Sequence, residues 1–432
     1  MKSTFYYSET SKRPSILLSV SLLAAFLFLL TGCCGKKNSE GSNTGKQVKL
    51  VFWNTMEGAE AEAMPAILAE FSKLHPEIQI EQVMTNFYET KSGFKKAVRD
   101  GVAPDIVRAD RFWMADFASS GVLSAIEEKQ IKKELEEMVP VAKEVIRYDN
   151  NYWAMPISVD SLAMFYNKKL FKKYNISPPT NFDEFAEHAK LMTEENTGQY
   201  GFFIYPNGWY FEPFYYGFGG QYFNESGELV FDYEVAKKSF QFLLHLKENL
   251  RAVPPINFRD KVYNTMIKSF GNGKIGMIFS GPWAINSIIK GSAFRDSLEN
   301  LGIAPLPAGP YGTFSPTGCQ TLAISSSSKY KPEALKFLKY MFSYDVQKRL
   351  SMANYGMPAN RKVFSAPELK NDPYLQTFIR QLQISRKIVT KPNQGNIYEP
   401  LGEKLKSVLN GEISTEYAIS DFIEEWKNKY GK

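Results

Sequence analysis

A strand, a helix and a second strand follow one another in residues 48–83, and this order constrains the fold of the 432-residue chain more than any other feature. VKLVFWN at 48–54 is apolar and aromatic, which favours a strand. Apolar residues then recur at helical spacing until Pro76 ends the helix, and IQIEQV at 78–83 forms the next strand. Such a unit pairs its strands in parallel, so we expect an α/β fold.

The alternation of strands and helices continues along the chain. APDIVRADRF at 103–112 predicts a short strand with a polar exit, and residues 152–171 predict strands that lead into a helix. Ligands of such sheets bind beyond the carboxyl ends of the strands. Asp110 and Asp160 lie near predicted strand ends and are therefore candidate binding residues.

Two further segments carry clear helix signals. Thr180 and Asp183 form a capping-box pattern before an apolar helical face. The stretch from 415 to 430 is amphipathic and is closed by Gly431. GNGKIG at 271–276 matches a dinucleotide-binding pattern, but here a helix precedes a strand, so we expect glycine to terminate the helix instead.

The N-terminus has the features of a lipoprotein signal peptide at 1–32. Basic residues precede an apolar run at 16–30, which is shorter than the about 20 residues of a membrane-spanning helix. The run ends in LTGC, which resembles a bacterial lipobox and makes Cys33 the predicted lipidation site. The alternative is an uncleaved anchor helix. Residues 33–46 contain the polar segment GKKNSEGSNTGK and predict a flexible tether.

Composition limits what the remaining chain can be. It is too long for one hydrophobic core, so two lobes are expected. The formal net charge of +6 is spread along the sequence, without the basic stripe of a nucleic-acid binder. Three cysteines exclude a disulfide framework, and Cys319 is predicted to be a small buried residue. With three histidines in addition, we expect neither a zinc site nor another cofactor.

The stretch NGWYFEPFYYGFGGQYF at 207–223 is the strongest indication of a binding site. Nine of its seventeen residues are aromatic, and Glu212 lies among them in what we expect to be a loop beside a cleft. Aromatic rings cover the apolar face of a sugar, while a carboxylate accepts hydrogen bonds from hydroxyl groups. The alternative for any single ring, Trp209 included, is a place in the hydrophobic core. At least one ring of the cluster is expected to contact a ligand.

The acidic candidates leave other functions open. Asp110, Asp160 and Glu212 could supply the carboxyl pair of a glycoside hydrolase, which requires a defined separation that the sequence does not provide. Each could also be a helix cap or a surface residue. No phosphate-binding loop, serine-nucleophile motif or zinc-protease motif is present.

Six segments in order resemble the solute-binding proteins of bacterial ABC importers, in particular the maltodextrin-binding group. They are PDIVRADRFWMADFASSGVLSAI (104–126), PISVDSLAMFYNKKLF (156–171), PPTNFDEF (178–185), FEPF (211–214), GKIGMIFSGPWAINSI (273–288) and APLPAG (304–309). The resemblance covers essentially the whole mature chain. It implies two α/β lobes of the periplasmic-binding type, with a hinge and a ligand cleft between the lobes. By analogy one lobe takes 47–157 and 306–355, and the other takes 158–305 and 356–432.

The resemblance also assigns roles to polar residues. Asp110 and Arg111 match a pair that binds sugar hydroxyls, and Glu212 matches a ligand-binding glutamate. Asp160 stands where the maltodextrin binders have a glutamate. Thr55, Met56 and Glu57 replace an expected Asp-Lys pair, and Glu57 joins the candidates there.

The remaining candidates are aromatic. Phe214 stands at the position of a stacking tyrosine, Trp283 matches a stacking tryptophan, and Tyr398 is a further stacking ring in place of a larger one. Val107 stands where a tryptophan is expected, so the ligand class is better supported than its identity. The resemblance implies a monomeric, lipid-anchored receptor without catalysis. It would bind maltose, maltodextrin or a related oligosaccharide outside the membrane and deliver it to ABC permease subunits. A same-fold receptor for a non-carbohydrate such as glycerol 3-phosphate, and a secreted glycoside hydrolase, are the alternatives.

Overall fold

The computed structural model describes residues 47–384 and 390–431, which belong to one compact unit. The predicted signal peptide, the lipidation site Cys33 and the tether at 33–46 lie outside the described residues. Within the described ranges, no helix combines the length and the apolar character that crossing a membrane requires.

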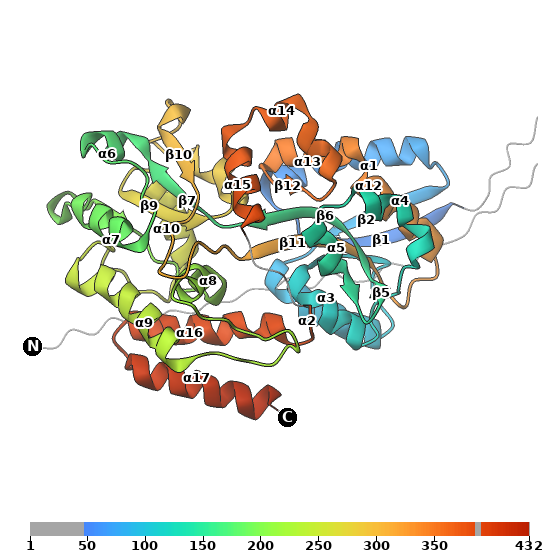
Figure 1. Ribbon diagram of the computed structural model, residues 1–432. Helices are drawn as coiled ribbons and strands as arrows, with labels where there is room; N and C mark the ends of the chain where they lie inside the picture. Colours follow the sequence, from blue (N-terminus) through green and yellow to red (C-terminus); the bar gives the residue numbers. More distant parts are fainter. Residues whose placement is uncertain (1–46, 385–389, 432) are drawn as a thin grey trace, which may run out of the picture. The chain divides into compact units, whose positions relative to one another are not determined.

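Six strands form a mixed sheet in the order β12-β6-β11-β3-β1-β2 (Figure 1). β1 pairs in parallel with β2 and β3, which confirms the predicted strand–helix–strand unit, whereas β11 runs antiparallel to its neighbours β3 and β6. The strands are β1 (Val48–Asn54), β2 (Ile78–Met84), β3 (Ile106–Asp110), β6 (Ala154–Ser161), β11 (Thr317–Ile324) and β12 (Met357–Pro358).

Helices cover the six-stranded sheet with aromatic side chains. The ring of Phe337 on α12 packs edge-on against Phe71 on α1 and Phe52 on β1, at centroid distances of 5.1 and 5.7 Å. A small hairpin of β4 (Arg147–Tyr148) and β5 (Asn151–Tyr152) follows α5. The helices are α1 (Gly58–Leu74), α2 (Phe87–Arg99), α3 (Arg111–Ser119), α4 (Lys132–Glu137), α5 (Pro140–Ile146), α12 (Lys331–Phe342) and α13 (Tyr344–Asn354).

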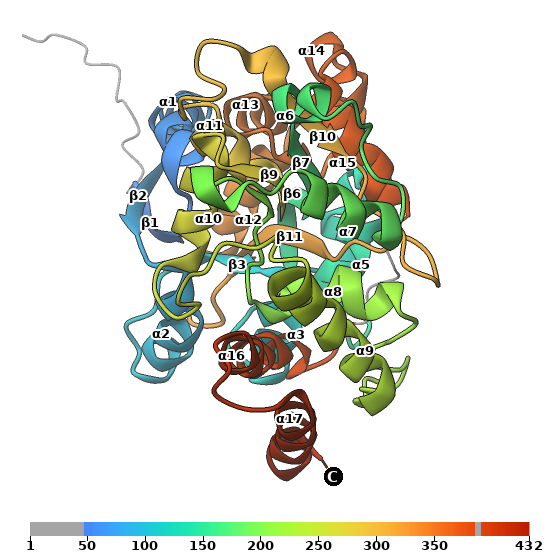
Figure 2. The same cartoon turned by 90° about the vertical axis from the view of Figure 1, so that its left-hand side faces the viewer.

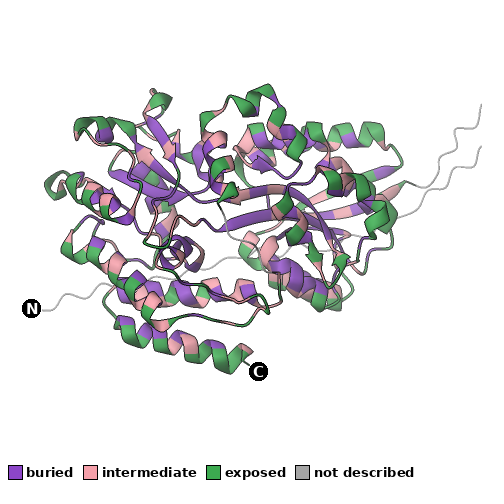
Figure 3. Ribbon diagram, in the orientation of Figure 1, coloured by how far each residue is buried: buried purple, intermediate pink, exposed green. Residues whose placement is uncertain are grey.

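A second sheet has four strands in the order β10-β7-β9-β8. Its strands are β7 (Ala163–Asn167), β8 (Tyr200–Phe202), β9 (Ile275–Ser280) and β10 (Leu301–Ala304). The remaining helices are α6 (Lys168–Lys173), α7 (Phe182–Leu191), α8 (Gly208–Gly217), α9 (Tyr233–Leu244), α10 (Val262–Gly271), α11 (Ile285–Ile288), α14 (Pro367–Lys370), α15 (Pro373–Gln383), α16 (Tyr398–Leu409) and α17 (Thr415–Tyr430). α16 packs against both α8 and α17 (Figure 2). Apart from the edge strand β2, the strands of both sheets are largely buried (Figure 3).

The chain passes from one sheet to the other through Leu162, the single residue between β6 and β7. The Ser315 hydroxyl accepts a hydrogen bond from the Leu162 N–H and donates one to the Leu162 carbonyl, both at 2.9 Å. The return crossing runs from β10 to β11 and contains Ser315. Two crossing segments are therefore tied together at one point. The change of sheet falls slightly beyond the predicted lobe boundary at 157/158, and the lobe limits stay a prediction.

Local predictions differ from the structure in two places. The stretch around Glu212 is not a loop: residues 208–217 form α8, whose N-cap Asn207 accepts a hydrogen bond from the Trp209 N–H at 2.9 Å. The cap of α7 is Asn181, one residue beyond the predicted Thr180, because the Asn181 side chain accepts from the Glu184 N–H.

Other local predictions are confirmed. Gly273 has a φ of 75° after α10, as expected for a glycine that terminates a helix. The predicted amphipathic helix at 415–430 is α17, and Cys319 is fully buried.

Candidate functional site

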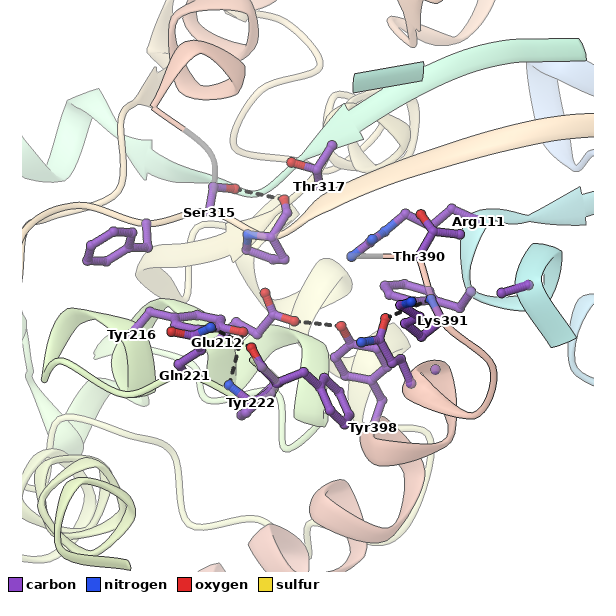
Figure 4. Close-up of a pocket in the computed structure, with 17 residues that line it drawn as sticks. Arg111, Glu212, Tyr216, Gln221, Tyr222, Ser315, Thr317, Thr390, Lys391 and Tyr398 are labelled. Atoms are coloured by element: carbon purple, nitrogen blue, oxygen red, sulfur yellow. Dashed lines mark hydrogen bonds between the residues drawn. The ribbon is translucent and has the colours of Figure 1, made fainter. Parts of the chain in front are cut away.

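A cavity of about 110 Å³ lies where α8, α16, the start of α3 and the segment leading into β11 meet (Figure 4). Aromatic rings and polar side chains line it together. The lining residues are Arg111, Phe112, Ala115, Glu212, Tyr216, Gln221, Tyr222, Phe223, Phe314, Ser315, Pro316, Thr317, Thr390, Lys391, Gln394, Gly395 and Tyr398. Of the predicted site residues, the structure brings Arg111, Glu212 and Tyr398 to this cavity.

Glu212 and Tyr398 form the central polar contact of the cavity. The Tyr398 hydroxyl donates a hydrogen bond of 2.6 Å to Glu212 Oε1. Burial, and then the neighbouring Glu212 carboxylate, raise the pKa of Tyr398 well above its usual value, so the hydroxyl stays protonated as a donor. Gly208 allows the close approach of the two helices, because a Cβ there would lie 2.7 Å from the Tyr398 carbonyl oxygen.

Arg111 and Phe112 enter the cavity from the first turn of α3. The Arg111 guanidinium lies over the Phe112 ring, 3.9 Å from its centroid, which is the geometry of a cation–π contact. The Phe112 ring in turn meets the Tyr398 ring at 4.6 Å. Cation, rings and carboxylate therefore form one continuous wall.

Asp110 acts as a helix cap instead of lining the cavity. Its buried side chain accepts hydrogen bonds from the Phe112 N–H at 2.9 Å and from Gln320 Nε2 at 2.7 Å. Burial raises its pKa, partly offset by the bond from the Phe112 N–H. Asp110 is thus a helix cap, the alternative role considered for it from the sequence, and it orients the helix that carries Arg111.

Asp160 lies on β6 opposite Gly318 of β11 and is half-buried. A Cβ at Gly318 would approach Asp160 Oδ1 to 1.8 Å, so glycine is required for the carboxylate to lie there. Burial and the nearby Asp110 carboxylate raise the pKa of Asp160 to about 7. Asp160 interacts electrostatically with Asp110, the cap of the helix that carries Arg111, but it does not itself line the cavity.

Trp209 and Trp283 pack against each other, with ring centroids 5.8 Å apart, and neither lines the cavity. The Trp283 indole N–H donates to the Tyr263 hydroxyl at 2.8 Å. The Trp209 Nε1 atom is buried and has no hydrogen-bond partner among the residues that the structure describes. The two indoles thus form a separate half-buried aromatic cluster, in which Trp209 retains an unused donor.

Two predicted residues lie away from the cavity. Phe214 is 3 % exposed, and its ring stacks on Phe279 at 5.3 Å within the core of the four-stranded part. In this structure the Phe214 ring therefore packs in the core and does not line the cavity, and its predicted contact with a ligand stays a prediction. The cause is the helix: Glu212 and Tyr216 are four residues apart and share a face of α8, whereas Phe214 faces away from it. Glu57 is exposed just before α1 and does not line the cavity.

Several lining residues are not among the predicted site residues, and Phe112, Phe314, Thr317 and Gln394 are four of them. Phe112 could have been found because it follows the Asp110–Arg111 pair directly. Thr317 and Gln394 are single polar residues without a motif. Only the tertiary fold brings them to the cavity.

The fold and the cavity are those of a class of proteins, the two-lobe α/β binding proteins, which hold a small ligand between their lobes. Within this class, residues 57–348 match the family model of the bacterial extracellular solute-binding proteins. The chain belongs to that family.

Relatives of known name agree with this assignment. The maltotriose-binding protein of Pyrococcus abyssi is 27 % identical over 373 residues, which cover 84 % of this chain and 77 % of the relative. The maltooligosaccharide ABC transporter solute-binding lipoprotein of Streptococcus pneumoniae strain R6 is 23 % identical, covering 98 % of this chain and all of the relative. The GacH receptor of Streptomyces glaucescens, solved unliganded and with acarbose, superposes with a TM-score of 0.83 at 29 % identity. It covers 89 % of this chain and 100 % of its own. The predicted two-lobe fold is confirmed by this similarity.

Proposed function

We propose that this protein is the receptor of an ABC sugar importer and captures maltose, a maltodextrin or a related oligosaccharide in the cavity between α3, α8 and α16. The observation that carries the proposal is the wall of Glu212, Arg111 and the rings of Phe112 and Tyr398. A sugar presents apolar C–H faces and a rim of hydroxyls. Rings and charged hydrogen-bonding groups complement these two surfaces.

Binding without a chemical step fits the composition of the cavity. Among its described lining residues, Glu212 is the one carboxylate. Glycoside hydrolysis by the common route needs two carboxyl groups that flank the scissile bond. Asp110 is occupied as the cap of α3, which supports a role in positioning.

Capture requires the cavity to change size. Its volume of about 110 Å³ is below the about 300 Å³ of small ligand pockets. A hinge motion that separates the lobes at 47–157 with 306–355 and 158–305 with 356–432 would admit an oligosaccharide and then close on it. The tied crossing of Leu162 and Ser315 is the natural pivot.

The anchor and the partner follow from the same proposal. A lipid on Cys33 and the tether at 33–46 hold a monomeric receptor on the outer side of the cell membrane, where it delivers its ligand to the permease subunits. The name of the pneumococcal relative, a lipoprotein of a maltooligosaccharide ABC transporter, supports this arrangement. The alternative is a receptor of the same fold that binds a non-carbohydrate such as glycerol 3-phosphate, and the following experiment distinguishes the two.

Titration calorimetry on residues 45–432 tests the proposal, because this part of the chain forms a compact unit. Maltose, maltotriose, a panel of other glycans and glycerol 3-phosphate are the ligands. We expect saturable binding of an α-glucan with no release of reducing ends on long incubation. Absence of heat with every glycan would contradict the sugar assignment, and release of reducing ends would contradict the absence of catalysis.

A further inference from the structure

Three buried polar atoms without a hydrogen-bond partner among the described residues belong to side chains that line the cavity. They are Arg111 Nε from α3, Thr317 Oγ1 from the start of β11, and Gln394 Nε2 from the short helix Gln394–Ile397. Thr317 is 3 % exposed and Gln394 is 9 % exposed. Buried polar groups in folded proteins are rarely left unpaired, because each unpaired group costs free energy. Their convergence from three distant segments therefore indicates a shared hydrogen-bonding role.

The neighbouring contacts fix how these groups are presented. Gln394 Oε1 accepts a hydrogen bond of 3.2 Å from the Lys391 N–H, so the amide nitrogen is the end of the side chain that has no partner among the described residues. The Ser315 hydroxyl is already bonded to both polar groups of Leu162. Thr317, two residues later at the start of β11, carries a hydroxyl that has no partner among the described residues.

The donor and acceptor pattern restricts the chemistry of the ligand. Arg111 Nε and Gln394 Nε2 are donors only, whereas the Glu212 carboxylate, which also lines the cavity, accepts. Thr317 Oγ1 can do either. A phosphate or carboxylate offers acceptors alone and would bring a negative charge toward Glu212. Neighbouring hydroxyl groups both donate and accept, and so match both the donor groups and the Glu212 carboxylate.

We propose that Thr317 and Gln394, together with Arg111, form a subsite that determines specificity by hydrogen bonding to hydroxyl groups on one sugar unit of the ligand. The inference rests on the proposed function and adds two residues to the site. Thr317 lies at the crossing segment and Gln394 beside α16, so the ligand would bond groups from both sides of the cavity. The subsite would thus recognise the hydroxyl groups of one sugar unit, and the other sugar units of the ligand would pack against the aromatic rings of the cavity.

The test compares three variants in calorimetry with the α-glucan that the wild-type protein binds. Thr317→Val keeps the shape and removes the hydroxyl, and Thr317→Ser restores the hydroxyl. Gln394→Glu keeps an acceptor for the Lys391 N–H and removes the amide donors. Ser351→Ala is the matched control: Ser351 is also buried with an unpaired hydroxyl in the described structure, but it does not line the cavity.

We expect Thr317→Val and Gln394→Glu to weaken binding about tenfold, while Thr317→Ser and Ser351→Ala stay near wild type. A set of singly deoxygenated maltotrioses provides the second measurement. The wild type should lose affinity for the analogue that lacks the contacted hydroxyl, and Thr317→Val should not distinguish that analogue from maltotriose. Such a loss of discrimination is not produced by a general structural defect.

The outcomes separate the two proposals. If the wild type binds a glucan and Thr317→Val and Gln394→Glu bind it equally well, the proposed subsite is wrong and the receptor function stands. If Ser351→Ala weakens binding as much as Thr317→Val does, the effect is structural and the subsite is also wrong. If the wild type binds no glycan, the proposed function fails and the subsite fails with it.

Discussion

The Tyr398 hydroxyl and the Glu212 carboxylate are joined by a hydrogen bond of 2.6 Å, although the residues are far apart in the chain. Glu212 belongs to α8 and Tyr398 begins α16, so the bond connects the aromatic segment to the C-terminal helices. It also orients the carboxylate toward the cavity. The hydrogen bond therefore lies in the cavity lining and also holds α8 and α16 close together.

Removal of this bond should weaken ligand binding. Tyr398→Phe keeps the ring against Phe112 and deletes the donor to Glu212. We expect about a tenfold loss of affinity, since a hydrogen bond to a charged group contributes about 1.5–3 kcal/mol. Calorimetry measures the loss. Tyr374→Phe, which deletes a hydroxyl bonded to the Leu298 carbonyl at 3.1 Å, is the control and should leave affinity unchanged. Equal affinities of wild type and Tyr398→Phe would show that the hydroxyl does not support the site.

The contact between α8 and α16 should not tolerate a side chain at Gly208. A Cβ there would lie 2.7 and 2.8 Å from backbone atoms of Tyr398, which cannot rotate away. Gly208→Ala should lower the free energy of unfolding by about 1–3 kcal/mol and weaken binding as well. The control is Gly93→Ala on α2, where the nearest atom would be 4.0 Å away and a gain of about 0.5–1 kcal/mol is expected. Denaturant titration measures both, and a neutral Gly208→Ala would contradict the close approach.

The pairing of Asp160 with Gly318 predicts a specific rescue. Gly318→Ala would force a Cβ onto the Asp160 carboxylate and should destabilise the protein by about 1–3 kcal/mol. In an Asp160→Ala background the same change should cost much less, because the clashing carboxylate is gone. A double-mutant cycle by thermal denaturation measures this coupling. Additive effects of the two substitutions would contradict a steric clash between a side chain at position 318 and the Asp160 carboxylate.

The raised pKa of Asp160 predicts how stability changes with pH. The folded protein keeps a proton on Asp160 up to about pH 7, whereas the unfolded chain releases it near pH 3.8. The contribution of Asp160 is therefore fully present below pH 3.8 and is lost progressively as the pH rises to about 7. Asp160→Asn should match the wild type at low pH and become more stable than it toward pH 7. Melting temperatures across this range measure the difference, and a gap that does not grow with pH would contradict the shifted pKa.

Much of the fold could be predicted because its signals are local. The strand–helix–strand unit at 48–83, the helix at 415–430 and the terminating Gly273 each follow from neighbouring residues. The aromatic stretch was harder. Pro213 and the glycines favour a turn, but the packing of rings such as Phe214 and Tyr215 in the core stabilises a helix there. Tertiary burial overrode a weak local preference.

The site was predictable in part for the same reason. Glu212, Arg111 and Tyr398 line the cavity as the sequence predicts, whereas Phe214 points into the core because residues 208–217 form a helix and not a loop. Thr317 and Gln394 have no local signature. Their role depends on which crossing segment and which short helix the fold brings together.

A crystal structure of residues 45–432 grown with maltotriose tests the central claim most directly. We predict one sugar bound between α3 and α8, with a ring against the Phe112–Tyr398 wall and hydroxyl groups in contact with Glu212 and Arg111. A sugar bound elsewhere on the molecule, with these residues free of contact at saturating ligand, would contradict the site.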